Sequence, residues 1–347
     1  MEAGRQFTFE RAPLRVYWEL TRACDLACRH CRAEAVAIRH PAELTAAEAS
    51  RLLEGLAAFG DPKPHLVLTG GDPLTRPDLF ALIAAAQALG IGVSVAPSAT
   101  PRLGTAEIRR FKEAGVEAIS LSIDGSTPAF HDAFRGIPGT FERTLDAARA
   151  AHDVGLPFQI NTLVSQETLP DLPAICLLAA ELGASRWSLF FLVSVGRGTV
   201  LQQISPDEAD EVMRWLAELA GRGGPPVVTT TEAPHFRRVM LQHRVSRARG
   251  HGAGIRDGNG IMFISHTGDV QPSGFLPLTA GNVRTDDVVS LYRESEVFRT
   301  LRRPDLFGGR CGRCEFHWVC GGSRARAYAA SGEPLAEDPL CSYEPRP

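Results

Sequence analysis

The chain has 347 residues, 44% of them hydrophobic, and a net charge of −3 at pH 7. This length suits two domains, or one large α/β unit with an appendage. The slight negative charge argues against a general nucleic-acid or membrane-surface binder, and no run of about eighteen apolar residues suggests a membrane span.

The N-terminal residues and the number of cysteines indicate where in the cell the protein is located. Residues 1–5 lead into a charged stretch without an apolar core, so we expect no secretory signal. Eight cysteines in a chain that is not exported more often hold metal than form disulfides. We therefore expect a cytoplasmic protein.

Short apolar runs alternate with longer amphipathic stretches through the first half of the chain. Strands are predicted at 16–20, 65–69, 92–96, 118–123, 158–163 and 187–191. Helices are predicted at 44–59, 77–89, 104–114, 139–154 and 169–182. Strands separated by helices pair in parallel through right-handed crossovers, and six such units fall short of the eight in a closed barrel. Ligand-binding residues are expected where these strands end, at the carboxyl edge of the sheet.

Three cysteines follow the first predicted strand: Cys24, Cys28 and Cys31, with the spacing C-x3-C-x2-C. Three such close thiolates can hold one iron–sulfur cluster, and three ligands for four irons leave one iron open to a non-protein ligand. Zinc is the alternative, with His30 or a distant residue as fourth ligand. No further cysteine lies between Cys31 and Cys176 to complete a zinc site.

The C-x3-C-x2-C spacing after a first strand resembles the signature of the radical S-adenosylmethionine (SAM) enzymes. The resemblance implies a partial (β/α)6 barrel, a [4Fe–4S] cluster on the three cysteines, and SAM bound to the open iron. An electron from the cluster then cleaves SAM to a 5'-deoxyadenosyl radical, so that the cofactor supplies the chemistry and the protein supplies orientation. A reducing electron donor, such as flavodoxin or ferredoxin, is implied as a partner.

The second predicted strand ends at Gly70, Gly71, Asp72 and Pro73. Alone, these residues are typical of a strand-to-helix turn. In radical SAM enzymes the corresponding motif is usually Gly-Gly-Glu-Pro and binds the amino group of SAM, so the resemblance assigns all four residues to SAM binding. Asp72 departs from this pattern, because its shorter side chain keeps the backbone contacts but leaves the carboxylate contact open.

Polar residues also follow the next three predicted strands. Ser98 lies between two prolines, where it either lines the pocket or completes a turn. Ser122 and Asp124 share one side of the fourth strand, so both can point to one ligand, and we expect both at the SAM site. The resemblance implies that Ser122 approaches SAM and that Arg135 binds its carboxylate, which suits the arginine fork; a surface ion pair of Arg135 is the alternative. Asn161, on the fifth strand, is expected to bond either to SAM or to a neighbouring strand.

The sixth predicted strand runs into a loop with apolar residues and one arginine. Leu192 suits the adenine face of SAM. Arg197 is a candidate for binding a substrate carboxylate, with a solvated loop charge as the alternative. Cys176, on an apolar helix face, is expected to be an ordinary core residue.

The pattern changes after residue 205. A helix from 206 to about 219, a strand at 227–231 and a helix near 234–247 form a bridging region. The predicted organisation is an N-terminal extension at 1–13, a radical SAM core at 14–200, the bridging region at 201–255 and a cysteine-rich domain at 256–347.

Four more cysteines lie near the C-terminus: Cys311, Cys314, Cys320 and Cys341. Four thiolates coordinate a cluster fully, which would then carry electrons or shape the site. Four cysteines are also a familiar structural zinc site, and the spacing alone leaves both possibilities open.

A predicted hairpin at 262–272, followed by these cysteines, resembles the SPASM domain of many radical SAM maturases. A full SPASM domain holds two auxiliary clusters. Here Ser273 stands where the family commonly has cysteine, and the residue four past Cys320 is Arg324. The four cysteines present match the second cluster. The resemblance therefore implies a smaller SPASM-like domain with one auxiliary [4Fe–4S] cluster, and about eight irons in all.

The segments 18–26, 69–74, 196–198 and 272–277 look most like the tetrapyrrole-modifying branch of the superfamily. That branch includes the heme synthase that oxidatively decarboxylates propionates of iron-coproporphyrin, and the heme d1 maturation proteins. We expect hydrogen abstraction from a carboxylate-bearing substrate, a tetrapyrrole side chain. The alternatives are a maturase of a ribosomally made peptide, because fold does not fix substrate, and a non-catalytic scaffold with zinc at both cysteine sets.

Overall fold

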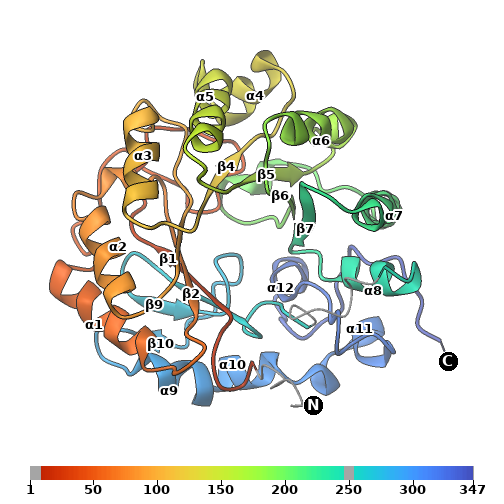
Figure 1. Cartoon of the computed structure of the whole chain (residues 1–347). Helices are drawn as coiled ribbons and strands as arrows, with labels where there is room; N and C mark the ends of the chain where they lie inside the picture. The colour runs from red at the N-terminus through yellow and green to blue at the C-terminus, as the bar shows by residue number, and fades with distance from the viewer. Residues whose placement is uncertain (1–8, 246–253, 347) are drawn as a thin grey trace, which may run out of the picture.

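The computed structural model describes residues 9–245 and 254–346. Its centre is a ten-stranded sheet with the order β10-β9-β8-β1-β2-β3-β4-β5-β6-β7. Helices lie around the outside of this curved sheet (Figure 1). The six expected strands pair in parallel and in chain order: β1 Arg15–Glu19, β2 His65–Thr69, β3 Val93–Val95, β4 Ala118–Ser122, β5 Phe158–Val164 and β6 Arg186–Phe191. The predicted α/β fold with a partial barrel is confirmed.

A helix forms within each predicted helical stretch of the barrel. They are α1 Ala46–Ala57, α2 Leu79–Ala88, α3 Thr105–Glu113, α5 Thr140–Asp153 and α6 Leu172–Glu181. A capping box starts α1, in which Thr45 Oγ1 accepts a hydrogen bond from Glu48 N and the Glu48 carboxylate accepts one from Thr45 N. One more helix, α4 (Pro128–Arg135), lies where the periodicity predicts none.

The chain after β6 adds another strand to the parallel sheet. Helix α7 (Pro206–Arg222) leads to β7 (Val227–Thr231), which pairs in parallel with β6. Helix α8 (His235–Gln242) follows, and the end of the helix predicted at 234–247 lies outside the described residues. The strand expected in the bridging region thus extends the barrel wall.

The hairpin predicted at 262–272 is confirmed as β8 (Ile261–Ile264) and β9 (Asp269–Gln271), which pair antiparallel. Strand β8 also pairs in parallel with β1, and β10 (Gly281–Asn282) pairs with β9. The remaining helices are α9 Val288–Glu294, α10 Glu296–Leu301, α11 Gly309–Arg313 and α12 Arg324–Ser331, with short 3-10 helices η1 Pro73–Thr75, η2 Leu169–Asp171, η3 Gly196–Val200 and η5 Pro304–Leu306. The C-terminal part is therefore joined to the barrel through the sheet itself.

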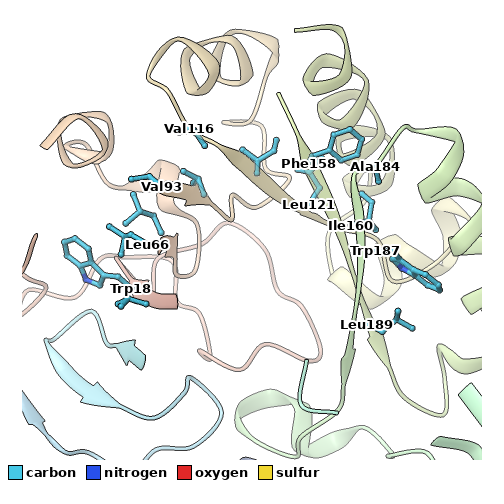
Figure 2. Packing of buried hydrophobic residues seen from close by; sticks show 14 of the residues in the cluster. Trp18, Leu66, Val93, Val116, Leu121, Phe158, Ile160, Ala184, Trp187 and Leu189 are labelled. Atoms are coloured by element: carbon cyan, nitrogen blue, oxygen red, sulfur yellow. The ribbon is translucent and has the colours of Figure 1, made fainter. Parts of the chain in front are cut away.

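Alternate strand residues give the sheet a core face and a cavity face. Trp18, Leu66, Val93 and Ile160 are fully buried in the core that the strands share with the helices (Figure 2). Burial of a side chain of this size contributes about 1.5–3 kcal/mol. Ser122, on the other face of β4, lines the cavity described below.

The C-terminal part holds the N-terminal end of the barrel sequence in place. Of the predicted extension 1–13, residues 1–8 lie outside the described residues. The hydroxyl of Tyr292 donates to the carbonyl of Phe9, and Leu14 N donates to Gly260 O. Among the described ranges, no helix has the length and apolar character that crossing a membrane requires.

Candidate active site

A cavity of about 250 Å³ lies at the carboxyl ends of the parallel strands. Cys24, Cys28 and Cys31 line it, as does Arg197. The residues predicted to bind SAM that also line it are Gly70, Gly71, Ser98, Ser122, Asp124, Arg135, Asn161 and Leu192. Residues from six separate loops or strand ends therefore meet at the three cysteines.

The three thiols of this cavity suit ligation of iron. All three cysteines are free, and each sulfur has an N–H group beside it: Leu26 N at 3.4 Å from Cys24 Sγ, Ala35 N at 3.4 Å from Cys31 Sγ, and Arg135 Nη1 at 3.8 Å from Cys28 Sγ. Burial raises the pKa of the Cys24 thiol to about 11. Ligation requires thiolates, so iron binding here must be coupled to loss of the thiol protons. The N–H groups would stabilise the sulfurs of a bound cluster.

Glycine turns press directly on the loop that carries the cysteines. A Cβ at Gly71 would lie 2.4 Å from Ala23 O, and one at Gly196, which has φ +53°, would lie 2.5 Å from Arg32 O. Gly71 N also donates to Thr21 O at 2.8 Å. These positions need glycine because backbone packs on backbone there. The Gly70-Gly71 pair thus shapes the cysteine loop, in addition to its predicted contact with SAM.

Gly71→Ala is expected to displace the cysteine loop and to lower the iron content of this site. The added methyl group meets backbone atoms, so it costs about 1–3 kcal/mol of stability unless the loop moves. Iron per chain after anaerobic reconstitution measures the effect. The matched control is Gly221→Ala in α7, where an added Cβ meets no atom within 4 Å. Equal iron contents in the two variants would contradict the packing argument.

The carboxylate of Asp72 is turned away from the cavity lining. It is fully buried; Oδ1 accepts a hydrogen bond from Leu74 N at 3.1 Å, and Oδ2 accepts one from Thr100 Oγ1 at 2.9 Å. Asp72 therefore caps η1 and holds the loop after β3. Pro73 begins η1 and is buried too, and neither residue lines the cavity. Their contact with SAM stays a prediction.

A buried ion pair lies beside Cys28. Arg135 Nη2 pairs with Asp124, whose side chain is 1% exposed, and Asp124 Oδ1 accepts a hydrogen bond from Leu163 N at 2.7 Å. Burial acts to raise the pKa of Asp124, but the charge of Arg135 together with smaller contributions, among them the hydrogen bond from Leu163 N, holds that pKa below its usual value. The alternative of a surface ion pair is therefore wrong. Helix α4 brings Arg135 to the sulfur of Cys28, which its position in the sequence did not predict.

His30, inside the cysteine loop, is neutral. Burial lowers its pKa to about 4, and its ring stacks on Phe134 with 4.9 Å between the ring centres. Its Nε2 lies 3.8 Å from Asp124 Oδ2. His30 thus packs against α4, and its ring lines the cavity next to the cysteines.

The smaller polar residues of the cavity wall have partners within the protein. Ser98 Oγ donates to Gly71 O at 2.7 Å and lies 3.5 Å from Cys24 Sγ. Asn161 Oδ1 accepts a hydrogen bond from Gln159 Nε2 at 2.7 Å, so its partner is on its own strand and not on a neighbouring one. Ser122 lies opposite Asn161 in the β4–β5 register. These side chains are at the cavity, and their contacts with SAM stay predictions.

Arg197 binds to the backbone of the cysteine loop. Its Nε donates to Cys28 O at 2.9 Å, and its Nη1 donates to Ala35 O at 3.2 Å. Its Nη2 is buried and has no hydrogen-bond partner in the part of the chain that the structure describes. The alternative of a solvated loop charge is therefore wrong. Its predicted role toward a substrate carboxylate stays open.

Arg32 and Phe275 are among the cavity residues that sequence reasoning missed. Arg32, directly after Cys31, has Nη2 2.9 Å from Glu19 Oε2, while Nη1 donates to Gly274 O at 3.1 Å. Phe275 comes from the C-terminal part and completes the wall. The position of Arg32 next to a ligand cysteine was a usable signal. Phe275 lies in the segment 272–277 that resembles the tetrapyrrole-modifying branch, but its place in the cavity could not be predicted, because it depends on the pairing of β8 with β1.

The four C-terminal cysteines line one small pocket together. Three of the sulfurs accept backbone hydrogen bonds of 3.4 Å: from Phe316 N to Cys314, from Gly322 N to Cys320 and from Asp338 N to Cys311. Burial raises the pKa of Cys320 to about 12 and that of Cys341 to about 11. The set predicted from spacing is thus assembled, and its donors fit a thiolate-bound cluster.

Ser273 and Cys176 both lie outside the second cysteine set. Ser273 is buried outside this pocket, and its Oγ accepts a hydrogen bond from Phe275 N at 3.2 Å. Cys176 packs on α6 against the main core, as expected. Over the described ranges, no three His, Cys, Asp or Glu side chains lie close enough to hold a single metal ion.

Comparisons with known proteins agree with this geometry. The model of the radical SAM superfamily matches residues 18–179. An AdoMet-dependent heme synthase of Oleidesulfovibrio alaskensis is 41% identical over 95% of this chain and 87% of its own length. A pre-heme d1 synthase of Dinoroseobacter shibae is 33% identical over 94% of this chain and 85% of its own. Streptococcus suis SuiB bound to the precursor peptide SuiA shares the fold, with a TM-score of 0.74, 15% identity, and coverage of 95% of this chain and 76% of that one.

The extent of these matches decides the family. The superfamily match begins in β1 and includes all three barrel cysteines. The heme synthase aligns along nearly the whole chain, so the C-terminal part is included as well. This relationship implies a [4Fe–4S] cluster and SAM, and it excludes the non-catalytic scaffold. The chain belongs to the radical SAM superfamily of SAM-dependent enzymes.

Proposed function

We propose that this enzyme oxidatively decarboxylates a propionate side chain of a tetrapyrrole, with iron-coproporphyrin as the first substrate to test. The observation that carries the proposal is Arg197. It lies at the cavity beside the cysteines, it pairs with no carboxylate of the described residues, and its Nη2 is left without a partner. A propionate carboxylate is the kind of ligand that such an arginine binds. The named activity of the heme synthase relative supports the same substrate class.

The cysteine loop and the strand ends have separate tasks. When bound, the [4Fe–4S] cluster and SAM would supply the electron and the 5'-deoxyadenosyl radical that removes hydrogen from the substrate. Loss of carbon dioxide from the substrate then releases one further electron, for which the proposed auxiliary cluster would be the acceptor. Cys24, Cys28 and Cys31 would hold the cluster. The residues proposed to bind and orient SAM are the backbone of Gly70 and Gly71, with Ser98, Ser122, Arg135, Asn161 and Leu192.

Charge within the cavity favours Arg197 over the other arginines as the substrate contact. Of the three arginines that line it, Arg32 is paired with Glu19 and Arg135 with Asp124. Each of these two charges is therefore balanced by a carboxylate at close range. Phe275, half-buried in the wall of the same cavity, offers an aromatic surface for a flat ring. A tetrapyrrole with carboxylate arms matches both features.

Arg197→Gln is expected to weaken the binding of iron-coproporphyrin about ten- to a hundredfold, because hydrogen bonds to charged groups contribute about 1.5–3 kcal/mol. An anaerobic absorbance titration measures the dissociation constant. The control is Arg29→Gln, since Arg29 is 44% exposed, pairs with Glu167 and does not line the cavity. Unchanged affinity in Arg197→Gln would remove Arg197 from the substrate site. Iron content is measured in both variants, because Arg197 also holds the cysteine loop.

We also propose that Cys311, Cys314, Cys320 and Cys341 hold one auxiliary [4Fe–4S] cluster, which brings the total to about eight irons. The alternative is zinc at this second set. Metal analysis of protein purified without oxygen separates the two, because zinc at the second set would leave about four irons and one zinc per chain. A reducing donor such as flavodoxin or ferredoxin is proposed to supply the electron for SAM cleavage.

A peptide maturase is the competing function. Its support is the shared fold with SuiB, which by itself says nothing of the substrate. The two functions are separated by which substrate stimulates the formation of 5'-deoxyadenosine. Stimulation by iron-coproporphyrin supports the tetrapyrrole substrate, whereas stimulation only by a precursor peptide encoded beside the gene supports the maturase.

A further inference from the structure

An arginine contacts a sulfur at the second cysteine set. Arg324 Nη2 lies 3.6 Å from Cys311 Sγ, and the side chain of Arg324 is fully buried. The residue begins α12, which belongs to the C-terminal part (Figure 1). An added Cβ at Gly322 would meet this guanidinium at 2.6 Å, so the chain leaves room for it here. Arg324 is thus buried directly beside a sulfur of the second cysteine set.

The positive charge of Arg324 is not neutralised by an ion pair among the described residues. Its guanidinium donates to three carbonyl oxygens: Gly322 O at 3.3 Å, Pro334 O at 3.0 Å and Ala336 O at 2.6 Å. The Phe307 ring covers it, with 4.4 Å from its central carbon to the ring centre. The nearby Asp257 carboxylate accepts from the backbone N–H groups of Arg324 and Ala325 instead.

The surroundings add to this excess of positive charge. Arg256 is buried on the same Phe307 ring, and it too is bonded to carbonyl oxygens, those of Gly254 and Leu301. Arg326, two residues after Arg324, differs because it pairs with the buried Asp338. Arg256 is therefore a second buried guanidinium next to Arg324 that has no ion pair among the described residues.

We propose that Arg324 raises the reduction potential of the auxiliary cluster. Reduction adds one electron, and therefore one negative charge, to a cluster that already carries four thiolates. A buried cation with an N–H group at a ligand sulfur stabilises this more negative state more than the oxidised one, since hydrogen bonds to sulfur and local charge set the potential. The inference rests on the auxiliary cluster of the proposed function.

Arg324→Gln is expected to lower the equilibrium constant for reduction of the auxiliary cluster about tenfold, which is about 59 mV for a one-electron couple. Arg324→Lys keeps the charge and is expected to shift the potential less. A redox titration of the full, reconstituted protein, followed by electron paramagnetic resonance, measures both. The signal of the three-cysteine cluster, identified by its change on adding SAM, is the internal reference and should not move.

Arg313→Gln is the matched control. Arg313 lies between Cys311 and Cys314 in the sequence but is exposed, so water screens the same loss of charge. We expect this variant to keep the unaltered potential. An equal shift in both variants would point to net charge alone and overturn the role of Arg324.

The possible failures are distinct. About four irons per chain and a single signal in the unaltered protein would refute the auxiliary cluster itself. Two clusters with an unchanged potential in Arg324→Gln would refute only the role of Arg324. Loss of the cluster in both the Gln and the Lys variant would make Arg324 a structural support of the pocket, which also contradicts the proposal.

Discussion

Cys24→Ala is expected to abolish the cleavage of SAM and to leave 5'-deoxyadenosine at the level found without protein. Cys24 Sγ lies at the cavity with those of Cys28 and Cys31. Two remaining thiolates cannot hold a cluster of four irons with one iron open to SAM, since three ligands are needed. The measurement is chromatography of 5'-deoxyadenosine after anaerobic incubation with SAM and dithionite.

Cys176→Ala is the matched control for this variant. Cys176 is a free cysteine on α6 that packs against the main core and belongs to neither set. Its replacement removes a thiol without touching a cluster, so SAM cleavage should continue at the unaltered rate. Equal cleavage by Cys24→Ala and the unaltered protein would refute the assignment of the three cysteines.

Cys314→Ala is expected to stop conversion of iron-coproporphyrin while part of the SAM cleavage continues. Cys314 lines the second pocket, which shares no lining residue with the first cavity over the described ranges. Iron should fall from about eight to about four atoms per chain. Metal analysis, 5'-deoxyadenosine and porphyrin product are measured on the same preparation.

Ser273→Ala serves as the control for the second set. The resemblance to SPASM domains places Ser273 where cysteine is common, and the structure places Ser273 outside the second pocket. This variant should keep about eight irons and full turnover. Eight irons in Cys314→Ala would show that the second set holds no cluster. Complete loss of SAM cleavage in Cys314→Ala would show instead that the two sites cannot be separated.

The barrel was predictable from sequence because each βα unit is marked locally. The strand predicted at 65–69 coincides with β2, since an apolar run bounded by proline and glycine has one consistent interpretation. Helix α4 was missed because a segment of eight residues with four apolar side chains is too short for a helical repeat to be recognised in it. The pairing of β8 with β1 joins segments more than two hundred residues apart, and no local pattern encodes it.

In the candidate site, too, local features could be predicted from the sequence, whereas contacts between distant segments could not. Both cysteine sets were identified because ligand spacing is a local property. The sequence left the role of the Asp72 carboxylate open, and only the packed structure shows that it caps η1 and accepts a hydrogen bond from Thr100. Arg324 could be noted as a departure from the family pattern. Its contact with Cys311 could not be inferred, because it depends on the fold of the segment between Cys320 and Cys341.

The substrate is the central claim, and one measurement tests it most directly. Reconstituted protein is incubated without oxygen with SAM, dithionite and iron-coproporphyrin, and the porphyrin is then analysed by mass spectrometry. We predict a product in which a propionate has lost its carboxyl group as carbon dioxide and has become a vinyl group, with one 5'-deoxyadenosine formed for each group lost. Unaltered porphyrin from a preparation that contains both clusters and cleaves SAM would contradict the proposed function.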